Sequence, residues 1–318
     1  MQKNTTYNSY HFIGVPLSEP RILIPLASPL IQAGSFNLYN PGSIQGKIFR
    51  QFGKVAAISG ILNMAGIFFA APIESFKATD TIKSILNNQT ITGLQNDWET
   101  ALGKTNILFA LSLGEPNYYR KVTALIYDKN AMPIAFAKVA CTTQAKALIV
   151  NEAMALEKVA SLKCESVVIP QLLGQDETDN TSWVLQSPLL SGRPSHNDLQ
   201  NEHITLLAEF AQKSAQTQSL NLSDILKSLR VILRNQIIPI KAGFESEKTF
   251  VAKLCKRLKA LSATEVNKPW PVTVAHGDFA PWNMRLIDGK VALYDWEYFI
   301  PLAPAGWDIL YFIFRVEN

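Results

Sequence analysis

The sequence predicts an α+β fold in which a small unit built on an antiparallel sheet precedes a larger, mainly helical unit. Three apolar runs of strand length, separated by turn residues, occupy residues 107–113, 119–127 and 133–140. After residue 200 the apolar residues take up the spacing of amphipathic helices. These helical segments are residues 204–220, 222–233 and 247–261. With 318 residues, 47% of them hydrophobic, the chain can bury one large or two ordinary cores.

Composition and charge favour a cytoplasmic, globular protein. The net charge is +4, and the Lys and Arg residues are scattered, so nucleic-acid binding gets little support. Cys141, Cys164 and Cys255 lie far apart without metal-ligand spacing, as expected of reduced core thiols. Residues 1–10 are polar and lack the apolar centre of a secretory signal, so export is not expected.

The first hundred residues form an N-terminal extension to which the sequence assigns no role. The polar stretch at residues 80–104 places its boundary near residue 100. Residues 55–73 carry no charge and are just long enough to span a bilayer, but small and polar residues leave them only moderately hydrophobic. A buried helix covering the rest of the protein is therefore favoured, with peripheral or spanning contact at the inner membrane face as the alternative. The preceding cations would suit an anionic membrane surface: Lys47, Arg50 and Lys54.

Lys138 is a lone cation inside the apolar strand at residues 133–140. A buried ammonium is costly unless it is paired or bound to an anion, so it needs a partner. In the helix that opens near Thr142, Glu152 falls on the same stripe as apolar residues, whereas Glu157 lies on another side. The sequence therefore predicts an ion pair between Lys138 and Glu152, and two ordinary exposed charges are the alternative.

Three polar residues, His276, Asp278 and Asn283, lie between the apolar run at residues 272–275 and a second strand-like run at 284–287. An Asp-Gly pair then predicts a hairpin turn, and the returning strand delivers Asp295 beside Asn283. Phosphoryl transfer needs a carboxylate to receive the proton of the attacking hydroxyl and oxygen ligands for magnesium. Asp278 fits the first role, and Asn283 with Asp295 fits the second.

The string HGDFAPWN at residues 276–283, followed by YDWEY at 294–298, resembles the phosphotransferase family of aminoglycoside phosphotransferases and choline kinases. The resemblance implies the bilobal protein-kinase-like fold, with ATP and Mg²⁺ as cofactors and a small hydroxyl compound as acceptor. It implies a nucleotide-binding small lobe at residues 101–189 and a catalytic lobe at 190–318. Residues 1–100 do not match the family.

The resemblance also implies roles for single residues. Lys138, held by Glu152, would steady the α and β phosphates of the nucleotide. Gly114 stands where a phosphate-covering turn belongs, although an ordinary hairpin turn fits it equally well. The last strands of the small lobe are expected at residues 167–173 and 182–186, and a hinge after them would bind the adenine edge. The nucleotide-binding residues near it are Gln186, Pro188 and Leu189.

Supporting roles are implied for three further residues around the motif. His276 would hold the loop, Asp308 would brace the backbone around His276, and Glu297 would touch metal or substrate. Relatives continue with more helices after the position of Asp308, so either the substrate wall is built differently or residues 1–100 contribute to it.

The acceptor stays open, because aminoglycosides, choline and sugars are all used by relatives and no segment distinguishes them. The alternative function is a nucleotide-binding pseudokinase or scaffold, associated with a membrane through residues 55–73. The sequence makes no prediction of oligomeric state.

Overall fold

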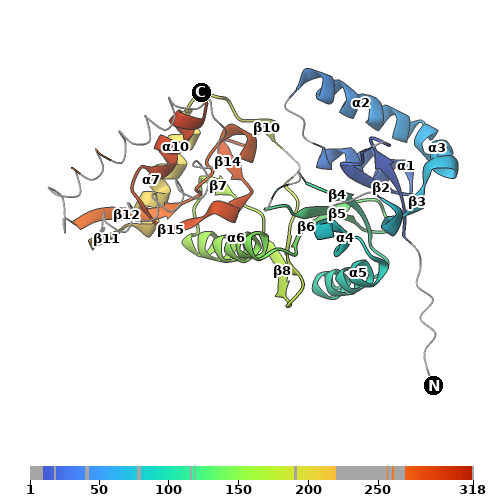
Figure 1. Ribbon diagram of the computed structural model, residues 1–318. Coiled ribbons are helices and arrows are strands. Elements are labelled where there is room, and N and C mark those ends of the chain that lie inside the picture. The colour runs from blue at the N-terminus through green and yellow to red at the C-terminus, as the bar shows by residue number, and fades with distance from the viewer. Residues whose placement is uncertain are drawn as a thin grey trace.

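The computed structural model describes residues 10–17, 19–39, 43–76, 80–114, 119–189, 192–219 and 269–316, with the single residues 117, 256 and 260. The chain forms two lobes, with the N-terminal half in one and the C-terminal part in the other (Figure 1). The predicted helix at residues 222–233 and Cys255 lie outside the described residues, and so does the predicted helix at 247–261 apart from residues 256 and 260.

The small lobe is built on one antiparallel sheet of eight strands within the described residues, in the order β3-β1-β2-β4-β5-β6-β9-β8. The three predicted strands are confirmed as β4, β5 and β6. The eight strands are β1 (His11–Val15), β2 (Ile22–Pro25), β3 (Ala71–Pro72), β4 (Leu108–Ser112), β5 (Val122–Tyr127), β6 (Pro133–Ala140), β8 (Leu172–Glu177) and β9 (Ser182–Gln186).

The N-terminal extension joins this sheet. Strand β2 pairs with β4, through Ile22 opposite Ser112 and Leu23 opposite Leu111. The predicted boundary near residue 100 therefore does not coincide with an edge of the sheet. Sequence could not show this, because the paired residues lie about ninety positions apart in the chain.

The two faces of this sheet are covered by different helices. Ile22 and Ile24 of β2 pack with Phe36 and Ala57, whereas Leu23 between them packs with Trp98 on the opposite side, as strand alternation requires. Figure 1 shows α2 and α3 on one side of the sheet and α5 on the other. The helices are α1 (Pro29–Ser35), α2 (Ile44–Ile58), α3 (Ile61–Phe69), α4 (Asp80–Lys83) and α5 (Asn88–Leu102), with 3-10 turns η1 (Phe36–Leu38) and η2 (Ile73–Ser75).

Residues 55–73 do not form the single buried helix that the sequence favoured. Helices α2 and α3 meet at a 91° bend at Gly60, whose φ of 81° is left-handed, and most of their large apolar side chains are exposed. Within the described residues, no individual helix has both the length and the apolar character needed to cross a membrane. The bent pair α2–α3 meets that criterion only when its two helices are taken together.

The second lobe, called the catalytic lobe after the role that the resemblance implies, carries α7 (Asn201–Ser214) and α10 (Trp307–Val316) beside two small sheets, of order β10-β13-β14-β7 and β11-β12-β15. The predicted hairpin is confirmed, because β13 pairs with β14 through Asp288 and Gly289, both with positive φ. The strands are β7 (Val167–Val168), β10 (Arg193–Pro194), β11 (Gln216–Ser219), β12 (Pro269–Ala275), β13 (Met284–Ile287), β14 (Lys290–Leu293) and β15 (Ile300–Pro304), and the 3-10 turns are η4 (Pro281–Asn283) and η5 (Trp296–Tyr298).

Two predicted elements differ in detail from the structure. The strand predicted at residues 167–173 is divided, because β7 pairs in parallel with β14 of the catalytic lobe and β8 belongs to the small-lobe sheet. The helix predicted at residues 204–220 ends at Ser214, after which β11 pairs with β12. In both cases a strand partner distant in sequence decides the outcome.

Helix α6 (Thr143–Leu162) joins the lobes and positions the site. Thr142 caps it by accepting a hydrogen bond from the amide of Ala145. Its residues Ala155, Leu156 and Val159 pack in the core of the catalytic lobe, while Ala145, Ile149 and Ala153 pack with Ala140 and Val184 of the small lobe. A residue midway along α6 is therefore held at the junction of the lobes.

Candidate active site

His276 is fully buried at the end of β12, where it organises the loop that follows. The amide of Asp278 donates to His276 Nδ1 at 3.2 Å, and His276 Nε2 lies 3.1 Å from the carbonyl oxygen of Tyr294. This pairing requires the neutral tautomer with its proton on Nε2. Burial lowers the pKa of His276 to about 4, so the ring stays neutral near pH 7. His276 ties the loop to the segment that carries Asp295.

Asp308, at the start of α10, holds the same loop from the other side. One carboxylate oxygen accepts the amide hydrogen of His276 at 2.7 Å and the other accepts that of Gly277 at 3.0 Å. Gly277 has a φ of 81°, and an added Cβ would lie 2.0 Å from the carbonyl oxygen of Tyr298. The structure thus places Asp308 against the backbone around His276, as the resemblance implied.

Asp308→Asn is expected to change how stability depends on pH. Burial raises the pKa of Asp308 from 3.8 to about 6, although the two amide hydrogen bonds oppose this. Between these values the folded chain holds a proton that the unfolded chain has lost. The stability that Asp308 contributes is therefore complete below about pH 3.8 and is lost as the pH rises through 6.

The measurement is urea unfolding of both proteins from pH 4 to pH 7. The difference in unfolding free energy, wild type minus variant, should shrink by on the order of 3 kcal/mol across this range. Parallel curves would show that the carboxyl does not titrate in this way.

Asp278 has both carboxylate oxygens engaged. Asn283 Nδ2 donates to Oδ2 at 2.7 Å and to the Asp278 carbonyl oxygen at 2.9 Å, and the Tyr311 hydroxyl donates to Oδ1 at 2.5 Å. Burial, followed by the bond to Asp278, raises the pKa of Tyr311 to about 12, so it remains a donor. The geometry orients Asp278 from two sides.

Sequence reasoning missed Tyr311. A signal was present, because Tyr311 lies three residues after Asp308 in α10, and residues at this spacing share a helix face. If Asp308 contacts the catalytic loop, the residue one turn further along is a candidate contact as well.

The predicted ion pair between Lys138 and Glu152 is present. Lys138 Nζ lies 2.7 Å from Glu152 Oε1 and 2.5 Å from Asp295 Oδ1, and the Glu152 side chain is fully buried. Glu157, predicted to lie on another side of α6, is exposed. Lys138 therefore joins the small lobe to the segment after β14 of the catalytic lobe.

For Lys138 and Asp295, charge attraction changes the pKa more than desolvation does. Burial alone would lower the pKa of Lys138, but Asp295 and Glu152 raise it above the usual value. Burial would likewise raise the pKa of Asp295, and Lys138 lowers it instead. Both groups are thus charged near pH 7.

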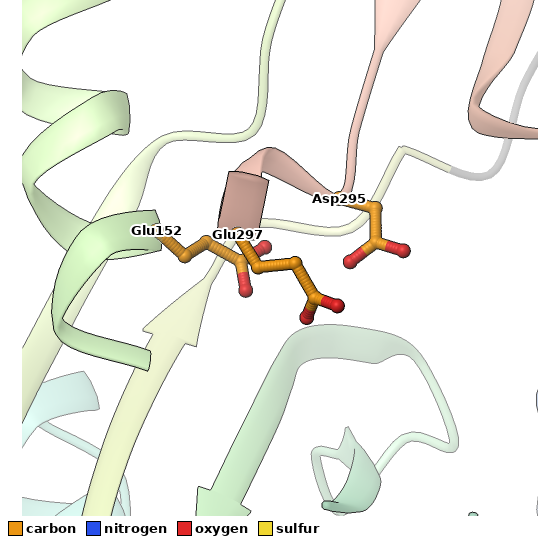
Figure 2. Close-up of side chains that lie close together, drawn as sticks. All are labelled: Glu152, Asp295 and Glu297. Carbon is orange, nitrogen blue, oxygen red and sulfur yellow. The ribbon is translucent and has the colours of Figure 1, made fainter. Parts of the chain in front are cut away.

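Glu297 lies in a second ion pair, with Lys121 from the segment before β5. Carboxylate oxygens of Glu152, Asp295 and Glu297 lie within 4.8 Å of one another. Figure 2 shows Glu152 on its helix, with Glu297 and Asp295 on the segment that enters and forms the short turn η5. Burial, and then the charge of Lys138, lowers the pKa of Lys121 to about 8.

Lys121 was not singled out from the sequence, because no spacing relates it to Glu297. Gly114, just after β4, has a φ of 63°, and an added Cβ would lie 2.5 Å from the carbonyl oxygen of Lys121. Because Gly114 has no side chain, its backbone can lie close to that of Lys121.

A cavity of about 440 Å³ opens beside Lys138 and Asp295. Among the described residues that line it, four are cations: Arg50, Lys121, Lys138 and Arg285. Of the residues predicted to bind nucleotide, Lys138, Gln186 and Leu189 line the cavity, whereas Gly114 and Pro188 do not. Glu152 bonds Lys138 but does not itself line the cavity. The surplus of cations suits an anionic ligand.

The N-terminal extension supplies part of the cavity wall. Asn37, Leu38 and Arg50 line it, and Arg50 is held by donating to the carbonyl oxygen of Tyr39 at 3.3 Å. Asn37 and Leu38 lie in η1 and Arg50 lies in α2, so the first hundred residues reach the site. The sequence left this contribution open.

No protein-family model matches the chain, and no curated protein sequence matches it. Among solved structures, the chain is similar to the GDP complex of wild-type aminoglycoside 2'-phosphotransferase-IIIa, with 14% identity over 71% of this chain and 78% of that one and a TM-score of 0.47. It is similar to the aminoglycoside phosphotransferase APH(3'')-Id from Streptomyces rimosus in complex with ADP and streptomycin, with 14% identity, coverage of 72% and 85%, and a TM-score of 0.45.

A third similar structure is the macrolide 2'-phosphotransferase MphH from Brachybacterium faecium, with 14% identity, coverage of 70% and 80%, and a TM-score of 0.38. The fold itself is seen in the arrangement of this chain's own strands and helices. An antiparallel small lobe provides the Lys138–Glu152 pair, and a second lobe provides the loop from His276 to Asn283 and the hairpin leading to Asp295. This is a bilobal, protein-kinase-like arrangement.

Proposed function

We propose that the protein is a phosphotransferase that moves the γ-phosphate of ATP to a hydroxyl group of a small molecule. One observation carries the proposal: Lys138 of the small lobe bonds both Glu152 and Asp295 at the edge of a cation-lined cavity. Phosphoryl transfer depends mainly on positioning and on neutralising phosphate charge, and this arrangement serves both.

Asp278 is the proposed acceptor-binding and proton-accepting residue. Its carboxylate is oriented by Asn283, which donates to Oδ2, and by Tyr311, which donates to Oδ1. A substrate hydroxyl would replace the Tyr311 hydroxyl at Oδ1. A carboxylate is a weak base toward an alcohol. We therefore infer that Asp278 mainly orients the hydroxyl and receives its proton late in the transfer.

The cations of the cavity are proposed to bind the nucleotide. Lys138 would hold phosphate oxygens, with Lys121, Arg50 and Arg285 adding charge around them. Gln186 and Leu189, at the end of β9 and just after it, would contact the base. The preference between ATP and GTP does not follow from these contacts.

Asn283 and Asp295 fit magnesium by their chemistry. Asp295 lines the cavity with a side chain 37% exposed, and Asn283 directs its amide nitrogen to Asp278, which leaves its amide oxygen as the ligand atom. Magnesium prefers such oxygen ligands. When bound, it neutralises phosphate charge. Glu297 is engaged by Lys121, so its proposed role is to position that lysine.

The test is ADP release from magnesium-ATP across aminoglycosides, macrolides, choline, ethanolamine and sugars, with mass spectrometry of the products. At least one hydroxyl compound should raise ADP release well above the rate without acceptor and gain the mass of one phosphate. Nucleotide binding without turnover on any compound would instead favour a pseudokinase or scaffold.

A further inference from the structure

Helices α2 and α3 both present large apolar side chains to the solvent. We call this apolar area the α2–α3 surface and define it by the exposed side chains of Ile44, Phe52 and Val55 on α2 and Ile61, Ile67 and Phe68 on α3. Phe52 is 72% exposed and Phe68 is 81% exposed. Large exposed apolar patches mark interaction sites in folded proteins.

The packing of these helices fixes which side faces outward. Small residues lie at the closest inward contacts of both helices: an added Cβ would lie 2.2 Å from a ring atom of Phe36 at Gly53 and 2.5 Å from a methyl of Leu26 at Gly66. Ala57 is fully buried in the same contact. Larger inward side chains cannot be accommodated, so the bulky residues remain on the solvent side.

The charge around the surface points to the chemistry of its partner. Residues 20–73 contain no Asp or Glu, and they contain four cations: Arg21, Lys47, Arg50 and Lys54. On α2, Lys47 is exposed beside the apolar stripe. Helices with bulky apolar residues on one face and cations along its border lie at the surface of anionic membranes.

The geometry points to attachment rather than insertion. The 91° bend at Gly60 separates two helices of 15 and 9 residues, each too short to span a bilayer alone. The α2–α3 surface also lies near the candidate active site, because α2 provides Arg50 to the lining of the cavity beside Lys138 and Asp295. We propose that the α2–α3 surface docks this protein on an anionic lipid surface, with the cavity close to the membrane. A second copy of the chain fits less well, because its surface would bring cations against cations.

The test is flotation of the full chain with vesicles of phosphatidylcholine alone or with 30% phosphatidylserine, a composition chosen to supply anionic charge. Wild type should float with the anionic vesicles, less with the neutral ones, and less again as salt is raised. The paired change Phe52→Glu and Phe68→Glu should lower the partition coefficient on the order of tenfold or more, because it places carboxylates at the membrane interface. Met132→Glu, at a side chain 59% exposed in the β5–β6 turn, is the matched control and should float like wild type.

Circular dichroism and thermal melting of all three proteins check that each is folded. Failure of folded wild type to float with anionic vesicles would overturn the proposal. So would a concentration-dependent dimer in light scattering that the paired change converts to a monomer, since the surface would then bind a second copy. The result is independent of the proposed chemistry, because flotation requires no turnover.

Discussion

Asp278→Asn is expected to lower kcat by roughly a hundredfold to ten-thousandfold while leaving nucleotide affinity within a factor of about two. The amide keeps the size of the side chain and one oxygen acceptor, so the hydrogen bond from Asn283 can persist. It loses the ability to receive the acceptor's proton. The measurement is acceptor-dependent ADP release, with nucleotide affinity from calorimetry.

Asp288→Asn is the matched control for this change. Asp288 is exposed in the turn between β13 and β14, with a φ of 49° that asparagine also adopts readily. It should keep full activity. An Asp278→Asn protein that turns over at near the wild-type rate would remove Asp278 from the mechanism, and an inactive Asp288→Asn protein would point to general damage.

Lys138→Met is expected to reduce both nucleotide binding and stability. The change removes the cation beside the cavity and leaves the fully buried Glu152 without its partner. Breaking a buried pair by removing one member costs about 3 to 5 kcal/mol. Nucleotide affinity should fall on the order of tenfold to a hundredfold, since charge-assisted bonds to phosphate contribute about 1.5 to 3 kcal/mol. Calorimetry and urea unfolding measure the two effects.

The double variant Lys138→Met with Glu152→Gln separates these effects. Removing the second charge should recover most of the lost stability, because no buried carboxylate is left unpaired, but nucleotide binding should stay weak. Lys146→Met, on the helix α6 that carries Glu152, breaks an ion pair with Glu177, whose side chain is 57% exposed, and two hydrogen bonds to exposed carbonyl oxygens of Thr178 and Asp179. It should cost less stability than Lys138→Met and leave nucleotide affinity unchanged. If the double variant regained nucleotide affinity, the lysine would be structural alone.

Two features of the site could be predicted because they depend on local pattern. The hairpin turn at Asp288 and Gly289 brings Asp295 back toward Asn283, and a tight turn can be recognised from the few residues that form it. Glu152 could be placed on the inner face of α6 because helical periodicity assigns faces, and a buried lysine needs a partner. The contact of Lys121 with Glu297 could not be found in this way, because no local repeat relates the two residues, and Tyr311 could be found only through the role expected of Asp308 one turn earlier.

The N-terminal extension shows where such reasoning fails. Low charge and apolar content favoured a buried helix at residues 55–73, yet the structure turns the bulky side chains outward. Composition reports how apolar a helix is, whereas the small residues Gly53 and Gly66 decide which side packs inward. Composition likewise gave no sign that β2 pairs with β4.

Local patterns in the chain were enough to predict the strands β4 to β6, the Lys138–Glu152 pair, and the hairpin that returns Asp295 beside Asn283, since each follows from periodicity or turn chemistry. Three other features could be seen only in the folded protein: Arg50 reaches the cavity, Tyr311 bonds Asp278, and the α2–α3 surface faces solvent. These depend on which segments meet in space, and that is set by packing between elements far apart in the chain rather than by any local pattern.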